Sequence, residues 1–122
     1  MHPHASQKIF TAQAANGSSV LFSPSRNGNY DIQFKKTGTG TGALAFETND
    51  LTDAEYQTDP TLGWVQHDMA AGTGVTSGKV DVPATNPWNQ KVKLTNISAR
   101  RCRWTLSGVA GSVSLDAWVS GN

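Results

Sequence analysis

The sequence ARRCRWTLSGVAGSVSLDAWV, at residues 99–119, is the clearest indication of the fold. Apolar residues alternate with polar ones on both sides of a short segment bounded by glycines. Alternation with a period of two is typical of strands that bury one face. The apolar face of the first strand carries Cys102, Trp104 and Leu106, and that of the second carries Val113, Leu115, Ala117 and Val119. The stretch therefore predicts two amphipathic strands of an all-β domain.

The simplest arrangement of these two strands is an antiparallel hairpin. A register that places Ser107 opposite Ser112 gives four further pairs: Trp104 with Leu115, Cys102 with Ala117, Arg103 with Asp116, and Arg101 beside Trp118. Apolar pairs on one face, with a charge pair and a cation–aromatic pair on the other, are favourable cross-strand contacts. We therefore predict a hairpin near the C-terminus.

The length of 122 residues suits one domain with a hydrophobic core of its own. A hydrophobic fraction of 37% with 12 glycines favours a thin sandwich of short strands over a deep enzyme fold. The net charge of +1 provides no overall field that would attract nucleic acid or a membrane. Cys102 is the one cysteine, so an internal disulfide is excluded, and its position on the apolar face predicts a buried thiol.

No run of apolar residues approaches the ~20 that a membrane-spanning helix needs. Residues 1–8 lack the apolar stretch of a secretory signal, so we expect synthesis and folding in the cytoplasm. We assign residues 1–7 to a flexible N-terminal arm and residues 8–122 to a single β-sandwich domain.

Further strands are predicted where short alternating runs lie between turn signals. The clearest has Tyr30, Ile32 and Phe34 alternating with polar residues. Weaker candidates lie at residues 8–14, 18–22, 44–46, 62–68, 79–82 and 92–94. Residues 49–61 form a loop with at most one helical turn, which a capping box at Thr52–Glu55 would begin. The total is roughly eight or nine short strands, typical of an antiparallel β-sandwich or jelly roll.

Catalytic signatures are not found in the sequence. His67 has no second ligand at metal-binding spacing, and His2 and His4 lie in the N-terminal arm. There is no nucleophile elbow, Cys–His pair or paired-carboxylate pattern. We therefore expect a non-enzymatic protein without a cofactor or a resident metal.

Charges are segregated along the chain. Five acidic residues lie close together, namely Glu47, Asp50, Asp53, Glu55 and Asp59. Calcium binding by this segment is left open. Lys91, Lys93, Arg101 and Arg103 alternate with apolar residues, which predicts that they point outward from two strands. Such segregation favours head-to-tail contact between copies or docking on a charged partner, with a merely solvated face as the alternative.

Two of the four tryptophans, Trp88 and Trp118, fall outside the predicted core. Exposed tryptophans are typical of sugar-stacking surfaces and of protein interfaces. Packing under a loop or against a second sheet is the structural alternative.

Three passages resemble the small β-sandwich virion structural proteins of tailed bacteriophages. They are LAFETND at residues 44–50 with Trp64 after it, RCRWTLSG at residues 101–108, and GSVSLDAW at residues 111–118. The resemblance covers about the last two-thirds of the chain. It rests on the succession of strands and turns and carries over no functional residue.

The resemblance implies a capsid decoration (cement) protein that bridges neighbouring subunits, or a tail accessory. Its expected partners are the major capsid protein or another virion protein, together with further copies of itself, most often as a trimer. Its expected location is the virion. The alternative is a carbohydrate-binding or host-adhesion module, for which a glycan is the partner. The candidate interface residues are His2, His4, Trp88, Lys91, Lys93, Arg101, Arg103 and Trp118.

Overall fold

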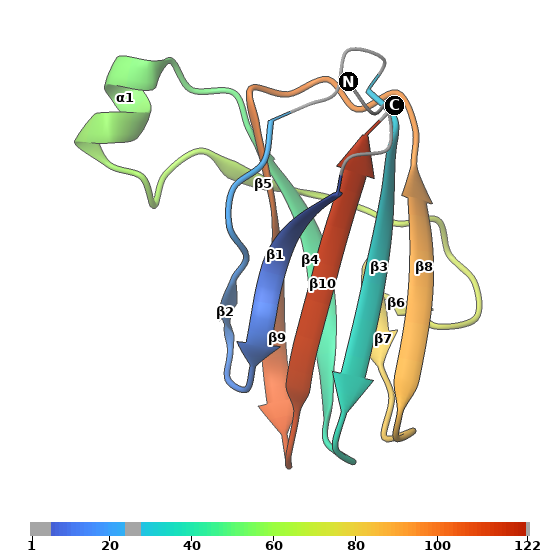
Figure 1. Cartoon of the computed structure of the whole chain (residues 1–122). Helices are drawn as coiled ribbons and strands as arrows, with labels where there is room; N and C mark the ends of the chain where they lie inside the picture. The colour runs from blue at the N-terminus through green and yellow to red at the C-terminus, as the bar shows by residue number, and fades with distance from the viewer. Residues whose placement is uncertain (1–5, 24–27, 122) are drawn as a thin grey trace.

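Two antiparallel β-sheets pack face to face in the computed structural model, which describes residues 6–23 and 28–121 (Figure 1). The four-stranded sheet has the order β1 (Ser6–Gln13), β10 (Ser114–Gly121), β3 (Tyr30–Thr37) and β8 (Trp88–Leu94). The six-stranded sheet has the order β2 (Gly17–Ser18), β9 (Arg101–Ala110), β4 (Thr41–Asn49), β7 (Lys79–Val82) and β6 (Val75–Thr76), and β5 (Trp64–His67) pairs with β4. The predicted all-β sandwich is confirmed.

The described residues form ten strands rather than eight or nine. Two of the ten, β2 and β6, contain only two residues each, and β6 lies in a glycine-rich segment without a clear alternating pattern. β1 begins at Ser6, so Ser6 and Gln7 pair with Ser120 and Val119 although we placed them in the arm. Residues 1–5, with the rest of that arm, lie outside the described residues.

The core lies between the sheets and follows the predicted alternation. Trp104 is fully buried, and its ring meets Phe34 of the facing sheet edge-on with the ring centroids 5.0 Å apart. On its own sheet Trp104 also contacts Phe46, at 5.3 Å between centroids. Burying side chains of this size contributes about 2 kcal/mol each to the free energy of unfolding. The two sheets are therefore held together by an aromatic cluster centred on Trp104.

The predicted C-terminal hairpin is wrong, because β9 and β10 belong to different sheets. β9 pairs with β4 and β2, whereas β10 pairs with β3 and β1. Trp104 and Leu115 both face the core as expected, but from opposite sides of it. A strand that crosses to the facing sheet shows the same period-two pattern as one that turns back within its own sheet. Alternation therefore identifies the buried face and leaves the partner strand open.

The crossing between β9 and β10 packs tightly against the β3–β4 turn. A Cβ atom at Gly40 would lie 2.7 Å from the carbonyl oxygens of both Ala110 and Ser112. Gly111 has a φ of 83°, a backbone conformation that side chains other than glycine's rarely adopt. Glycine at these two positions permits the close approach of the two turns.

The side-chain pairs expected across the hairpin change accordingly. Arg103 pairs with Glu47 of β4 instead of Asp116. Asp116 pairs with Lys8 of β1, with 3.4 Å between Lys8 Nζ and the Asp116 carboxylate. Both pairs link strands that are far apart in the sequence.

The predicted helical turn is confirmed as α1 (Asp53–Thr58), which is longer than the one turn expected. Thr52 and Glu55 form the capping box, since Glu55 N donates to Thr52 Oγ1 and Thr52 N donates to the Glu55 carboxylate. The hydrogen bonds from Thr52 lower the pKa of Glu55. α1 projects from one end of the sandwich and contains no buried residue (Figure 1).

A lysine occupies a core position that the sequence analysis did not single out. Lys36 follows Ile32 and Phe34 on the inward face of β3 and is fully buried. Its ammonium donates to the carbonyl oxygens of Gly40, at 2.9 Å, and of Pro83. Desolvation by burial lowers the pKa of Lys36. This side chain ties the β3–β4 turn to the segment between β7 and β8.

No helix within residues 6–23 and 28–121 is long and apolar enough to cross a membrane.

Candidate binding surfaces

The two arginines of β9 lie on the outer face of the six-stranded sheet, where other side chains of the chain bind them. Arg103 Nε donates to Glu47 Oε1 at 2.8 Å, and its guanidinium lies 4.0 Å from the centre of the Trp64 ring. Arg101 lies 4.2 Å from the centre of the Tyr56 ring instead of beside Trp118. The Arg101 guanidinium also donates to the Leu51 carbonyl oxygen and to the Asp53 carboxylate. Arg101 thus holds α1 against the sheet, and Arg103 binds side chains of β4 and β5.

The acidic segment is likewise bound within the chain. Asp50 accepts a hydrogen bond from the backbone N–H of Arg100, at 2.9 Å. Asp59 accepts hydrogen bonds from the side chain and backbone of Thr61, which lower the pKa of Asp59. Across the described parts of the chain, no three His, Cys, Asp or Glu side chains form a group that could hold a metal ion. Two of the segregated basic residues, Arg101 and Arg103, therefore meet carboxylates of the acidic segment, Asp53 and Glu47, within one molecule.

The outer face of the four-stranded sheet carries a partly exposed tryptophan, Trp118, among charged and polar side chains. Its central row follows the register from Lys8 of β1 to Trp118 of β10, Gln33 of β3 and Lys91 of β8. Lys8 Nζ lies 5.3 Å from the centre of the Trp118 ring, and Trp118 remains partly exposed. Flanking rows add Asp31, Lys93, Lys35, Asn89 and Asp116. We call these nine residues the Trp118 face; the four strands that carry them lie side by side in Figure 1.

The Trp118 face carries an excess of positive charge, with four lysines against two aspartates. One of the lysines, Lys8, is paired with Asp116. The other three, Lys35, Lys91 and Lys93, are exposed and form no ion pair with another described residue. Exposed lysines near a partly exposed indole leave this face open to an external partner of negative charge.

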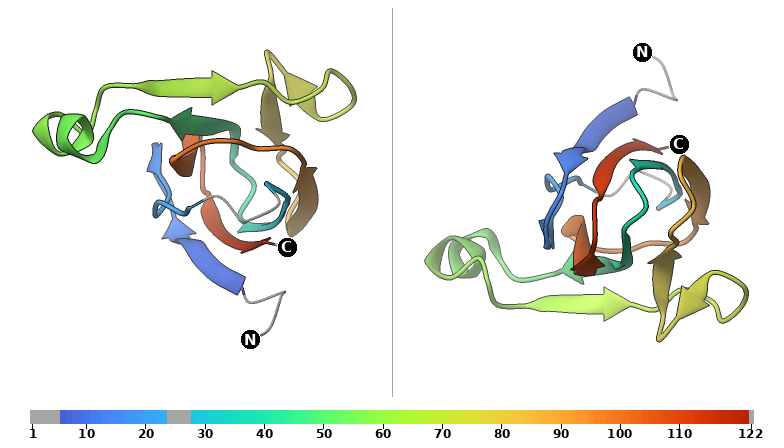
Figure 2. Two further views of the ribbon diagram at one scale, coloured as in Figure 1. Left: turned by 90° about the horizontal axis from the view of Figure 1, so that it is seen from above. Right: turned by 90° about the horizontal axis from the view of Figure 1, so that it is seen from below.

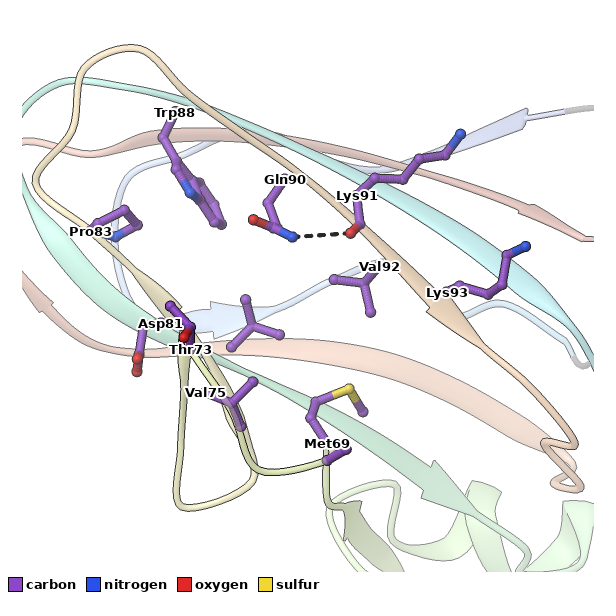
Figure 3. Close-up of a pocket in the computed structure, with 13 residues that line it drawn as sticks. Met69, Thr73, Val75, Asp81, Pro83, Trp88, Gln90, Lys91, Val92 and Lys93 are labelled. Atoms are coloured by element: carbon purple, nitrogen blue, oxygen red, sulfur yellow. Dashed lines mark hydrogen bonds between the residues drawn. The ribbon is translucent and has the colours of Figure 1, made fainter.

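A cavity of about 520 Å³ lies between β8 and the β6–β7 hairpin (Figure 3). The apolar part of its lining is formed chiefly by Met69, Val75, Val80, Trp88 and Val92. The polar part of its lining comes from Thr73, Asp81, Gln90, Lys91 and Lys93. Trp88 and Val92 point toward the cavity, whereas the ammonium groups of Lys91 and Lys93 point away from it. The other side of the Trp88 ring stacks on Phe34, with 6.3 Å between centroids.

The candidate interface residues therefore have different surroundings. Lys91, Lys93 and Trp118 share the Trp118 face, and Trp88 lines the neighbouring cavity, to which Lys91 and Lys93 also contribute. Arg101 and Arg103 are bound on the opposite sheet by Asp53, Glu47, Tyr56 and Trp64. His2 and His4 lie outside the described residues.

Cys102 is buried, as predicted, and desolvation raises the pKa of its thiol to about 11.

Two features of these surfaces were missed in the sequence. Gln33 lies between Trp118 and Lys91 in the register of the sheet, and only the strand order shows that these three residues are neighbours. The rings of Tyr56 and Trp64 pack edge-on, 6.2 Å apart, over the β9 arginines. The capping box at Thr52 was the only local signal for that second cluster.

No protein-family model matches this chain, and no curated protein matches it.

Proposed function

We propose that this protein is a non-enzymatic structural component of a bacteriophage virion that attaches to its partner through the Trp118 face. More specifically, we propose that the protein is a capsid decoration protein that bridges neighbouring subunits. The observation that carries the attachment is the contrast in charge pairing: Lys35, Lys91 and Lys93 form no ion pair with a residue in 6–23 or 28–121, whereas the β9 arginines are bound within the chain. The assignment to a virion rests on the resemblance described above.

The physical properties of the Trp118 face suit docking on a folded partner. Hydrogen bonds between four strands make it rigid, so little conformational entropy is lost on binding. An aromatic side chain surrounded by polar groups is the usual composition of a protein interface. The exposed lysines favour an acidic partner and speed the encounter at low salt. On a particle with many equivalent sites, several weak contacts of an oligomer add together.

The virion assignment is tested by fractionation. Antibodies against the purified protein are applied to phage particles from the organism that encodes the chain, after banding in a density gradient. We expect the protein in the banded particles at a constant ratio to the major capsid protein. Its restriction to the unbanded soluble fraction would contradict the proposal.

The attachment surface is tested with variants added back to particles that lack the protein. The triple change Trp118→Ala, Lys91→Glu and Lys93→Glu is expected to abolish attachment. Lys79→Glu is the matched control, because Lys79 lies on β7, outside the Trp118 face. Equal attachment by the triple variant and the control would remove the Trp118 face from the proposal.

Carbohydrate binding is the second candidate function, and the cavity at Trp88 favours it. Its volume falls in the range of small-ligand sites, and it combines an aromatic ring with Thr73, Asp81 and Gln90 in its lining. Titration with a panel of bacterial surface polysaccharides should then change the tryptophan fluorescence, and Trp88→Ala should remove the change. No response across the panel would exclude this function.

A further inference from the structure

We infer that the free edge of β8 accepts an extended segment of a partner protein as a fifth strand of the four-stranded sheet, and that this segment alternates apolar and acidic side chains. The inference goes beyond the proposed function, since it concerns the backbone edge of β8 and applies whether or not the partner belongs to a virion; it shares Lys91 and Lys93 with the Trp118 face.

β8 ends the four-stranded sheet. All seven of its residues pair with β3, from Trp88 opposite Lys36 to Leu94 opposite Tyr30. No other described strand pairs with β8. Figure 2 shows β8 and the β6–β7 hairpin on the same side of the sandwich, where the two sheets are not joined by strand pairing. A strand of this length with an unpaired edge is a template for one more strand.

The direction of the backbone groups supports this role. Gln90 Nε2 donates to the Lys91 carbonyl oxygen at 3.1 Å, the hydrogen bond drawn in Figure 3. At the end of β3, Gly38 N donates to the Asn86 side chain, so the even-numbered residues of β3 direct their backbone groups toward β8. By the alternation of an antiparallel ladder, Asn89, Lys91 and Lys93 then direct theirs toward the free edge. The Gln90 amide thus occupies a position that a partner's N–H would take.

The cavity beside this edge defines one face of the added strand. A new strand would lie about 4.8 Å from β8, along the opening between β8 and the β6–β7 hairpin. Its inward side chains would enter the cavity of about 520 Å³ and meet Met69, Val75, Val80 and Val92. Apolar side chains are therefore required at alternate positions of the segment.

The lysines define the other face. Lys91 and Lys93 point away from the cavity and form no ion pair with a described residue. Acidic side chains directly across from them would form favourable cross-strand pairs. Pairing of two β8 edges from two copies would instead bring lysines close to lysines, which is unfavourable. The charge pattern thus favours a different, acidic segment over a second β8.

The test uses the full chain and a synthetic peptide of alternating valine and glutamate, as long as the seven residues of β8. Calorimetric titration measures binding, and amide hydrogen exchange by NMR locates the peptide. We expect the amides of Asn89, Lys91 and Lys93 to exchange rapidly in the free protein and to be protected in the complex. Absence of binding, or binding without protection of these three amides, would overturn the inference.

Two charge variants make the test specific. Lys91→Glu combined with Lys93→Glu should weaken binding of the acidic peptide by about tenfold, since two cross-strand pairs change from attractive to repulsive. The double variant should bind the corresponding valine–lysine peptide instead. Lys35→Glu is the control, because Lys35 is exposed on the same face of the sheet but lies on β3, away from the free edge. An equal loss of binding per charge in this control would indicate general electrostatics and contradict strand addition.

Failure of the peptide test and failure of the proposed function are distinguishable. The changes at Lys91 and Lys93 affect both tests, so the distinction depends on Trp118→Ala alone, which should weaken attachment to particles. Trp118 lies two strands away from the free edge of β8. The peptide test should be insensitive to Trp118→Ala.

Discussion

The outer faces of the two sheets carry basic residues in similar sequence patterns but in opposite physical states. On β9, Arg101 and Arg103 lie against aromatic rings and carboxylates of the same chain. On β8, Lys91 and Lys93 are exposed and form no ion pair within the part of the chain that the structure describes. The difference follows from the neighbouring elements, since β4, β5 and α1 surround the arginines, whereas β8 is an edge strand. An outward basic residue indicates a docking surface only when the fold leaves it unpaired.

The largest expected effect is at Arg103. Its side chain is only 22% exposed, so Arg103→Ala removes a charged hydrogen bond to Glu47 and the contact with Trp64. We expect a loss of about 2 kcal/mol in the free energy of unfolding. Urea denaturation measures it, with Arg100→Ala as the control on an exposed arginine. Equal stability of the two variants would mean that the β9 arginines are as free as the β8 lysines.

A second effect concerns Lys36, which is basic but lies inside the core. Burial lowers the pKa of Lys36 in the folded state, so the unfolded state binds the proton more tightly. The free energy of unfolding should therefore rise with pH as the pH increases from the lowered folded-state pKa toward the ordinary lysine value of about 10.4. Urea denaturation across that alkaline range should show this rise in the wild type.

The control for this pH dependence is Lys36→Met, which keeps an apolar stem and cannot be protonated. Its stability should lack the contribution of Lys36 to the alkaline rise. The same slope in both proteins would show that Lys36 is not the group responsible.

A smaller effect is expected at Asp116, on the Trp118 face. Its pKa is lowered chiefly by the hydrogen bond from Ala12 N, and Lys8 adds to the shift. A carboxylate with a lowered folded-state pKa stabilises the protein above its unfolded value, near pH 4, and this contribution is lost as the pH falls through the folded value. Thermal unfolding between about pH 5 and pH 2 should therefore show a smaller loss for Asp116→Asn than for the wild type. Parallel curves would contradict this role of Asp116.

The smallest effect on the free energy of unfolding is expected at the β8 lysines. Lys91→Ala and Lys93→Ala should each change the free energy of unfolding by less than about 0.5 kcal/mol, as exposed substitutions without partners do. The same denaturation series measures it. A loss as large as that of Arg103→Ala would show that these lysines are structural and would weaken both binding proposals.

Local patterns predicted the local features well. The capping box at Thr52 predicted the start of α1, since both partners lie within one turn of the chain. The alternation around Trp104 and Leu115 predicted which side chains are buried. The predicted hairpin failed because pairing within a sheet and packing across a core impose the same period on two successive strands. The partners of Arg101 and Arg103 were missed for the same reason, since they depend on which strands are neighbours.

By itself the sequence determined the class of the fold, the inward and outward faces of its clearest strands and the burial of Cys102, because these depend on the short-range periodicity of apolar residues. Only the tertiary structure decided that β9 and β10 lie in different sheets and that Arg101 and Arg103 form ion pairs with Asp53 and Glu47. It also decided that two carbonyl oxygens bind Lys36 and that no other described strand pairs with the edge of β8 beside the cavity. Each of these involves contacts between residues far apart in the chain, such as Lys36 with Pro83 and Arg103 with Glu47. Their energies arise from burial and charge pairing that no local pattern specifies.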